Sequence, residues 1–187
     1  MEEIEPEQAK VMDTVAPFLK RLYVLFDGAI DLYNGKYPAE VRAQHSDRAA
    51  ANNVYCHAWH ALEQEFSEEP GFQFRELEGR LNVLLIRDAL VMRVKKVDAN
   101  GRWRNHKSKQ QAKFDGQLPL PGLPPEATRV VLGYHPDAVF SCVERVILRP
   151  ARGTWVSQIV EDGAAYEWVD ITPKSLPLGE ARGKATR

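Results

Sequence analysis

The fold class of this chain follows from residues 83–97, which read VLLIRDALVMRVKKV. Two apolar runs, 83–86 and 90–97, flank Arg87-Asp88-Ala89, and this arrangement predicts two strands paired in a hairpin. Residues 72–77 alternate apolar and polar side chains and predict a strand before the hairpin. Asn100-Gly101 predicts a turn after it, because this pair favours positive φ. Four further strands are expected at residues 129–134, 138–148, 154–160 and 166–171.

The residues before Gly71 predict helices. Asp13 or Thr14 can cap a helix whose apolar side chains recur at helical spacing as far as Asn34-Gly35. A second helix is expected from near Pro38 to about Phe66, and its polar residues 44–48 are a candidate interruption. Helices followed by strands predict an α+β fold, with an N-terminal helical layer (1–70) and a mainly antiparallel β-sheet (71–174) in one folded unit. Residues 175–187 predict a disordered tail.

The composition is that of a folded cytoplasmic protein. The chain has 187 residues, of which 44% are hydrophobic and 27% charged. Its start, Met1-Glu2-Glu3-Ile4-Glu5, is acidic where a secretory signal would be basic, and no apolar run is long enough to cross a membrane. Cys56 and Cys142 lie far apart in the sequence, and we expect two buried thiols rather than a disulfide.

The charge is unevenly distributed along the chain. Residues 1–70 contain 13 acidic and 6 basic residues, whereas residues 72–114 contain 11 basic and 4 acidic residues. Such a field can attract an anionic partner, although the acidic helices and the basic sheet can equally neutralise each other.

A basic arm, defined as residues 102–114, contains no acidic residue. Its aromatic residues Trp103 and Phe114 bracket most of its cations, and an aromatic among cations can stack on a base while the cations hold phosphates. Trp103 can equally be a core anchor. The candidate nucleic-acid-binding residues are Arg102, Trp103, Arg104, Lys107, Lys109 and Lys113.

The arm leads into Gln117-Leu118-Pro119-Leu120-Pro121, here called the 117–121 segment. The prolines predict an extended, exposed peptide, which loses little entropy on docking. Leu118 and Leu120 would fill an apolar cleft of a partner, and the Gln117 amide would set the register. In the alternative, the two leucines pin a crossover loop onto the sheet.

Catalytic and metal-binding patterns are weaker. Cys56 and His60 share a helix face, but a third metal ligand at useful spacing is missing, so we expect no metal and no cofactor. Glu78, Asp88 and Arg93-Val94-Lys95 resemble the acidic and lysine positions of PD-(D/E)xK nucleases. Those enzymes need a carboxylate two residues before the lysine, where this chain has Arg93, so the resemblance implies at most a degraded nuclease.

A broader resemblance covers about residues 90–160. The stretches that carry it are Arg93-Val94-Lys95-Lys96-Val97-Asp98, Arg104-Asn105, Gln110-Gln111-Ala112-Lys113-Phe114, Gln117-Leu118-Pro119-Leu120-Pro121-Gly122 and Val131-Leu132-Gly133-Tyr134. They resemble the SocB-like toxins of alphaproteobacteria, which bind the DNA polymerase sliding clamp. The resemblance implies a toxin that inhibits replication, with Gln117, Leu118, Leu120 and Pro121 as its docking peptide and an antitoxin or protease adaptor as a further partner. We therefore expect a binding protein rather than an enzyme, with a nuclease or a nucleic-acid-binding accessory protein as alternatives.

Overall fold

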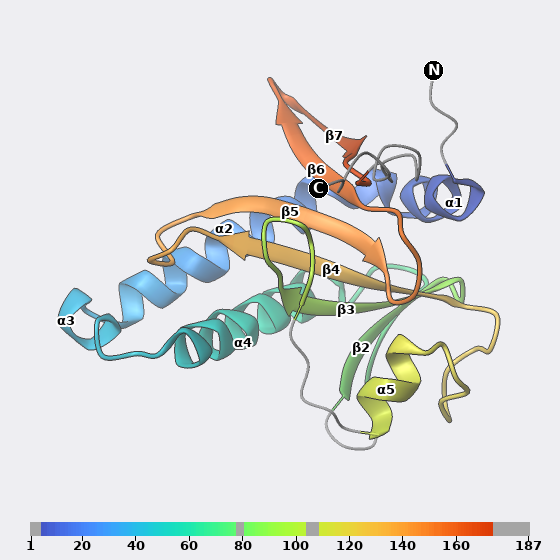
Figure 1. The fold of residues 1–187 in the computed structure, drawn as a ribbon, viewed down its shortest axis with the longest axis horizontal. Helices are drawn as coiled ribbons and strands as arrows, with labels where there is room; N and C mark the ends of the chain where they lie inside the picture. The colour runs from blue at the N-terminus through green and yellow to red at the C-terminus, as the bar shows by residue number, and fades with distance from the viewer. Residues whose placement is uncertain (1–4, 78–80, 104–108, 174–187) are drawn as a thin grey trace, which may run out of the picture.

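The computed structural model describes residues 5–77, 81–103 and 109–173. Helices occupy the first part of the chain and strands the second, so the predicted α+β class is confirmed (Figure 1). The helices are α1 (Pro6–Val15), the 3-10 turn η1 (Ala16–Phe18), α2 (Leu19–Lys36), α3 (Ala39–Arg42), α4 (Asp47–Phe66) and α5 (Lys109–Asp115). The strands are β1 (Phe72–Leu77), β2 (Leu81–Ile86), β3 (Leu90–Lys96), β4 (Thr128–Pro136), β5 (Val143–Pro150), β6 (Ser157–Asp162) and β7 (Ala165–Asp170).

The helical layer differs from the prediction only at its beginning. The first helix starts at Pro6 rather than near Asp13, and the 3-10 turn at Ala16–Phe18 accommodates Pro17 before α2. The predicted interruption is confirmed, because Ser46 accepts a hydrogen bond from the Ala49 N–H and caps α4. Among the described residues, no helix is both long enough and apolar enough to span a membrane.

The strands form one sheet whose order, within the described residues, is β1-β2-β3-β4-β5-β6-β7. Neighbouring strands are antiparallel except β3 and β4, which are parallel. Parallel neighbours need a long crossover, and residues 97–127 supply it. The predicted sheet is therefore confirmed as mainly antiparallel, but the parallel pair and the helix α5 within its crossover were not anticipated.

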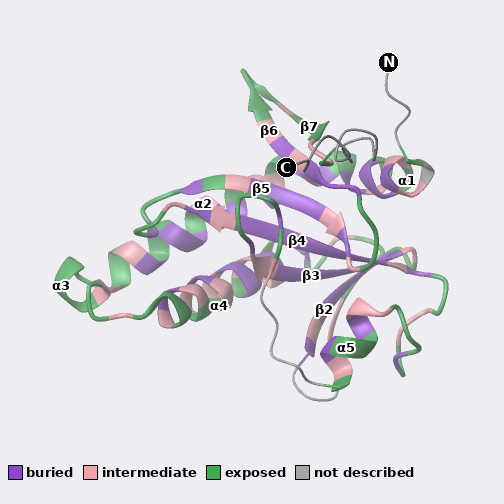
Figure 2. Ribbon diagram, in the orientation of Figure 1, coloured by how far each residue is buried: buried purple, intermediate pink, exposed green. Residues whose placement is uncertain are grey.

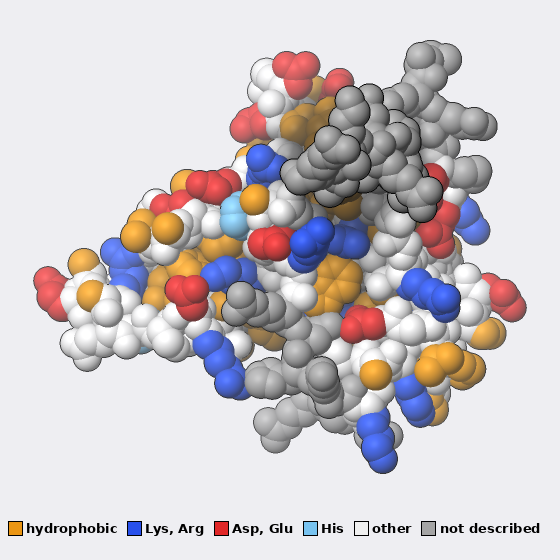
Figure 3. Space-filling view, viewed as in Figure 1, with side chains coloured by type: hydrophobic (Ala, Val, Ile, Leu, Met, Phe, Trp, Pro, Cys, Tyr) orange, Lys and Arg blue, Asp and Glu red, His pale blue; other side chains and the backbone are white. Residues whose placement is uncertain are grey.

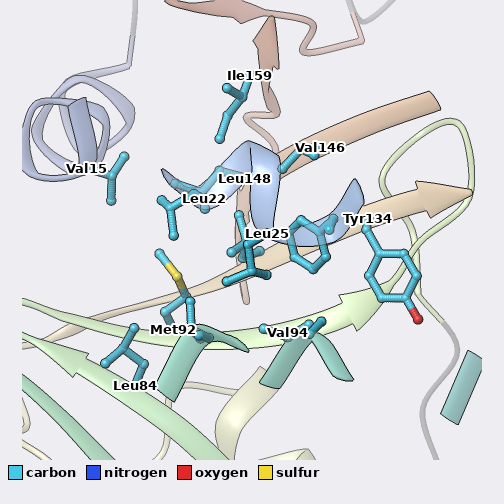
Figure 4. Close-up of a cluster of buried hydrophobic side chains, with 14 of the residues drawn as sticks. Val15, Leu22, Leu25, Leu84, Met92, Val94, Tyr134, Val146, Leu148 and Ile159 are labelled. Carbon is cyan, nitrogen blue, oxygen red and sulfur yellow. The ribbon is translucent and has the colours of Figure 1, made fainter. Parts of the chain in front are cut away.

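The main apolar core lies between the sheet and the helices α1, α2 and α4. Alternate residues of the central strands, such as Met92 and Val94 of β3, meet Leu22 and Leu25 of α2 there (Figure 4). Tyr134 of β4 stacks on Phe26 of α2, with ring centroids 5.2 Å apart. Buried residues predominate along β3 and β4 and in the middle of β5 (Figure 2). The helices α1, α2 and α4 thus cover one face of the sheet.

The other face carries a smaller apolar cluster, here called the second cluster. It is covered by α5 and by the loop that follows this helix (Figure 1). Its buried members are Leu81, Val83, Leu85, Val91, Phe114, Leu120, Ala127 and Val131. The elements predicted to be functional are therefore attached to the face of the sheet that the large helices leave uncovered.

Candidate functional site

The crossover between β3 and β4 contains the basic arm and the 117–121 segment. Its helix α5 has only 7 residues, too few for a helix that is stable alone in water. Tertiary contacts therefore hold it. Phe114 is completely buried in the second cluster, and Arg93 of β3 donates a hydrogen bond of 2.6 Å to the Gln111 side chain.

Arg129 of β4 anchors the end of α5. Its guanidinium donates hydrogen bonds to the carbonyl oxygens of Lys113 at 2.7 Å and Leu118 at 2.6 Å. The Lys113 carbonyl belongs to the last turn of α5, where no intrahelical donor is available, and Leu118 lies three residues beyond the end of the helix. Arg129 is 4% exposed, and the guanidiniums of Arg129 and Arg93 both lie over the Phe114 ring.

Gln117 caps α5 rather than beginning an extended peptide. Its φ is +54°, and its N–H donates to the Phe114 carbonyl, while the Leu118 N–H donates to the Lys113 carbonyl. These two bonds form a Schellman motif, in which the left-handed position is usually a glycine. The prediction that the backbone is extended from Gln117 onward is therefore wrong for this residue.

The 117–121 segment is only partly exposed. Gln117, Leu118 and Pro121 are exposed, and the Leu118 side chain is 54% accessible. Leu120 is 7% accessible and belongs to the second cluster. The expected exposed peptide is thus confirmed for three of the four candidate docking residues and is wrong for Leu120. The alternative, a leucine that pins the crossover to the sheet, describes Leu120 correctly.

The basic arm likewise contains both exposed residues and residues that are buried or half-buried. Arg102, Lys109 and Lys113 are exposed, whereas the candidates Arg104 and Lys107 lie outside the described residues. Trp103 is half-buried against the second cluster and against Val97, Ile147 and Val156, and the Arg149 guanidinium lies 5.2 Å from its ring centroid. Trp103 is therefore the core anchor that the sequence left as an alternative. Phe114 is buried and offers no stacking surface.

A groove is lined by residues of both the basic arm and the 117–121 segment. It has a volume of about 290 Å³ and lies between the end of β1, one side of α5 and the loop beyond it. Its lining residues are Leu77, Lys109, Gln110, Lys113, Leu120 and Pro121. Figure 3 shows basic and hydrophobic side chains together in the region of α5. The groove thus combines two ammonium groups with an apolar floor.

Three exposed cations of this surface form no ion pair with another described residue. In the described part of the chain, the ion pairs are those of Arg21 with Glu65 and Glu69, and of His135 with Glu144. None of them includes Arg102, Lys109 or Lys113. These three cations therefore have no ion-pair partner among the described residues, and their charge can attract an anionic partner.

Among the described residues, those that resemble a nuclease site do not form a carboxylate cluster. Arg93 is 8% exposed and hydrogen-bonded to Gln111, and Asp88 is exposed in the β2–β3 turn. Glu78 lies outside the described residues. No group of three His, Cys, Asp or Glu side chains that could hold a metal occurs in the described ranges. Burial lowers the pKa of Arg93 to about 10 and that of Lys95 to about 8.

The other candidate metal ligands do not form a group of three within the described residues either. Cys56 and His60 are exposed on α4, and burial lowers the pKa of the half-buried His57 between them. Cys142 is exposed as well. The expectation of two buried thiols is therefore wrong, because both cysteines are exposed, Cys56 on α4 and Cys142 in the loop before β5.

In comparisons with known proteins, no family model, no curated protein and no solved structure matches this chain. Sequence reasoning missed the helix α5, and it missed the hydrogen bonds of Gln111 and Arg129 that attach this helix to the sheet. The available signal was the run Gln110-Gln111-Ala112-Lys113-Phe114, which contains good helix formers and one large apolar side chain. Its shortness concealed the helix.

Proposed function

We propose that this protein is a non-enzymatic binding protein that holds a nucleic-acid backbone on the groove beside α5. The observation that carries the proposal is the pair of exposed lysines, Lys109 and Lys113, which line the groove without an ion-pair partner among the described residues. Four residues apart on a helix, they lie on the same side and can contact neighbouring phosphates. Exposed Arg102 adds to the positive field.

The groove floor supports a single strand rather than a duplex. Leu120 and Pro121 offer an apolar surface beside the two ammonium groups, and an unpaired base can pack there while its phosphates meet the lysines. A duplex presents only its backbone to such a narrow groove. We therefore expect single-stranded DNA or RNA to bind more tightly than the same sequence in a duplex.

The test is a fluorescence-anisotropy titration of a labelled single-stranded oligonucleotide at several salt concentrations. The double variant Lys109→Gln/Lys113→Gln should bind more weakly, and its salt slope should be smaller by about 1.4, since each lost phosphate contact on a single strand removes about 0.7. The matched control is Lys10→Gln/Lys36→Gln, which removes two exposed lysines from α1 and α2. Equal slopes for the two double variants would show that the groove is not the binding surface.

A second candidate function is docking on the bacterial sliding clamp, as the resemblance to the SocB-like toxins implies. The observation that favours it is the exposure of Leu118, a large apolar side chain next to exposed Gln117 and Pro121. Docking through both leucines would require Leu120 to leave the second cluster, at a cost in folding free energy. The toxin activity, the antitoxin and the protease adaptor belong to this candidate.

Docking on the clamp can be tested by replacing only exposed residues of the 117–121 segment. If the segment docks, Gln117→Ala/Leu118→Ala should weaken binding of purified clamp by roughly 30-fold or more in calorimetry, because one hot-spot leucine contributes about 2 kcal/mol or more. Folding should be nearly unaffected, because neither side chain is buried. Full clamp binding by this variant, or its absence in the unmodified protein, would remove the candidate.

A further inference from the structure

The outer side of α2 carries large apolar side chains that remain exposed. Val24 is 46% and Leu32 is 43% exposed, whereas the other large apolar residues of this helix mostly lie in the main core. The two exposed residues are eight positions apart, so they lie on the same side of the helix. Exposed and buried residues alternate along α2 in Figure 2. This helix therefore packs on the core with one side and presents an apolar surface with the other.

A groove of about 260 Å³ lies beside Val24, between α2 and α4. Its lining residues are Lys20, Arg21, Val24, Leu25, Ala61 and Glu65. Leu25 is buried and Ala61 is half-buried, so the deeper part of the groove is apolar. Charged side chains form its rim, where the Arg21 guanidinium makes ion pairs of 2.6 Å with Glu65 and with Glu69. An apolar groove with a charged rim is suited to a helix of a second molecule.

Gly28 leaves open space on the same side of α2. It lies four residues after Val24, and a Cβ added there would meet no heavy atom of another element within 4 Å. A glycine inside a helix destabilises that helix relative to alanine. Packing among the described residues does not require this glycine, because a side chain would fit at its position. A missing side chain here instead allows a second helix to approach the backbone of α2 closely.

The charges of this surface complement a second copy of the same helix. Lys20 and Asp31 are exposed, lie eleven residues apart and face the same side as Val24, because eleven residues make about three helical turns. Neither side chain forms an ion pair with another described residue. In two antiparallel α2 helices, Lys20 of each copy would lie beside Asp31 of the other. The same alignment places Val24 of each copy over Gly28 of the other, because both pairs have their midpoint near Phe26.

We propose that α2 is a dimer interface, at which the α2 helices of two copies of this chain pack antiparallel about a two-fold axis near Phe26. Each Val24 fills the open space at Gly28 of the other copy, and each Lys20 forms an ion pair with Asp31 of the other copy. A two-fold interface uses the same surface twice, and this surface is self-complementary in shape and in charge. Helix α5 lies on the opposite face of the sheet, so the dimer leaves the groove beside α5 accessible in both copies (Figure 1).

The first experiment measures the dissociation constant of the dimer by sedimentation equilibrium, with the purified protein at concentrations up to roughly 100 μM. The unmodified protein should dimerise in this range. Gly28→Leu should weaken the dimer by roughly ten-fold or more, because the added side chain occupies the space that Val24 of the other copy needs. The matched control is Asn52→Leu, which adds a leucine at an exposed position of α4 on the side of that helix opposite to Ala61. This control should leave the dissociation constant unchanged.

A thermal melt separates loss of the dimer from loss of the fold. At a protein concentration where the monomer predominates, Gly28→Leu should melt no lower than the unmodified protein. The reason is that leucine is a better helix former than glycine and that its Cβ meets no neighbouring element. A lower melting temperature of this variant would contradict the open space at Gly28 on which the proposal depends.

The antiparallel alignment is tested by reversing charges. Lys20→Asp and Asp31→Lys should each weaken self-association, because like charges then meet at both ends of the interface. In an equimolar mixture of the two variants, both pairs again join a lysine to an aspartate, so a heterodimer should form with roughly the affinity of the unmodified dimer. The control is Glu126→Lys, which reverses an exposed charge in the loop before β4 and should not change the affinity.

Three results would overturn the proposal. An unmodified protein that stays monomeric over the whole range would show that α2 does not pair with itself, and its exposed side would then serve a different protein. Unchanged self-association of Gly28→Leu, Lys20→Asp and Asp31→Lys would place the contact between copies elsewhere. A mixture of the two charge variants that recovers no heterodimer would contradict the antiparallel alignment. None of these measurements uses nucleic acid, so they are independent of the proposed function.

Discussion

Leu120→Ala tests whether the 117–121 segment is part of the folded core. Leu120 is 7% exposed in the second cluster, and it also lines the groove. Replacing a buried leucine by alanine costs about 2–5 kcal/mol. Because one side of Leu120 borders the groove, water can fill part of the space, and we expect the lower part of this range, about 2–3 kcal/mol.

Leu118→Ala is the matched control. It is the same substitution two residues earlier, at a side chain that is 54% exposed, and it should change the stability by no more than about 0.5 kcal/mol. In a chain of this size, 1 kcal/mol shifts the melting temperature by about 2–4 °C, so Leu120→Ala should lower it by roughly 4–12 °C. Leu118→Ala should lower it by roughly 2 °C or less.

The assay is circular dichroism, with a thermal melt and a urea titration of each variant. Equal, small effects of the two substitutions would refute the reasoning, because Leu120 would then be free of the core. The segment would in that case be available as a complete docking peptide. A large loss for Leu120→Ala alone restricts docking on any partner to Gln117, Leu118 and Pro121.

Three further predictions concern the same region. Gln117→Gly should raise the free energy of unfolding by about 0.5–1 kcal/mol, measured in urea, because Gln117 has φ +54° and glycine adopts this conformation without strain; a decrease would contradict the capping role. Arg129→Met should lower it by about 2–3 kcal/mol, because the Lys113 and Leu118 carbonyls lose a charged donor; Arg152→Met, at an exposed arginine, is the control and should have little effect. The third prediction concerns pH. The pKa of Lys95 is about 8 in the folded protein, whereas its ordinary value is 10.5. Between these two values the unfolded state binds more protons than the folded state, so the free energy of unfolding should rise with pH. The rise is measured as the difference between the unmodified protein and Lys95→Met, and a difference that is constant from about pH 7 to 10 would contradict the burial of this lysine.

The sequence by itself determined the order of the elements. Helical periodicity before Gly71 and the apolar runs around Arg87-Asp88-Ala89 predicted helices followed by a sheet, because local spacing and turn residues act over a few positions. The polar residues 44–48 correctly marked the break between α3 and α4. These features needed no knowledge of distant contacts.

Only the tertiary structure decided how the functional candidates are presented. The sequence offered no distinction between Leu118 and Leu120, since both are leucines beside prolines, and their burial depends on the position of α5 over the second cluster. Helix α5 is itself too short to form alone and is held by Arg93 of β3 and Arg129 of β4, the two strands of the parallel pair. Exposure and hydrogen-bonded support arise from contacts between residues far apart in the chain, and local spacing of residue types does not reveal these contacts.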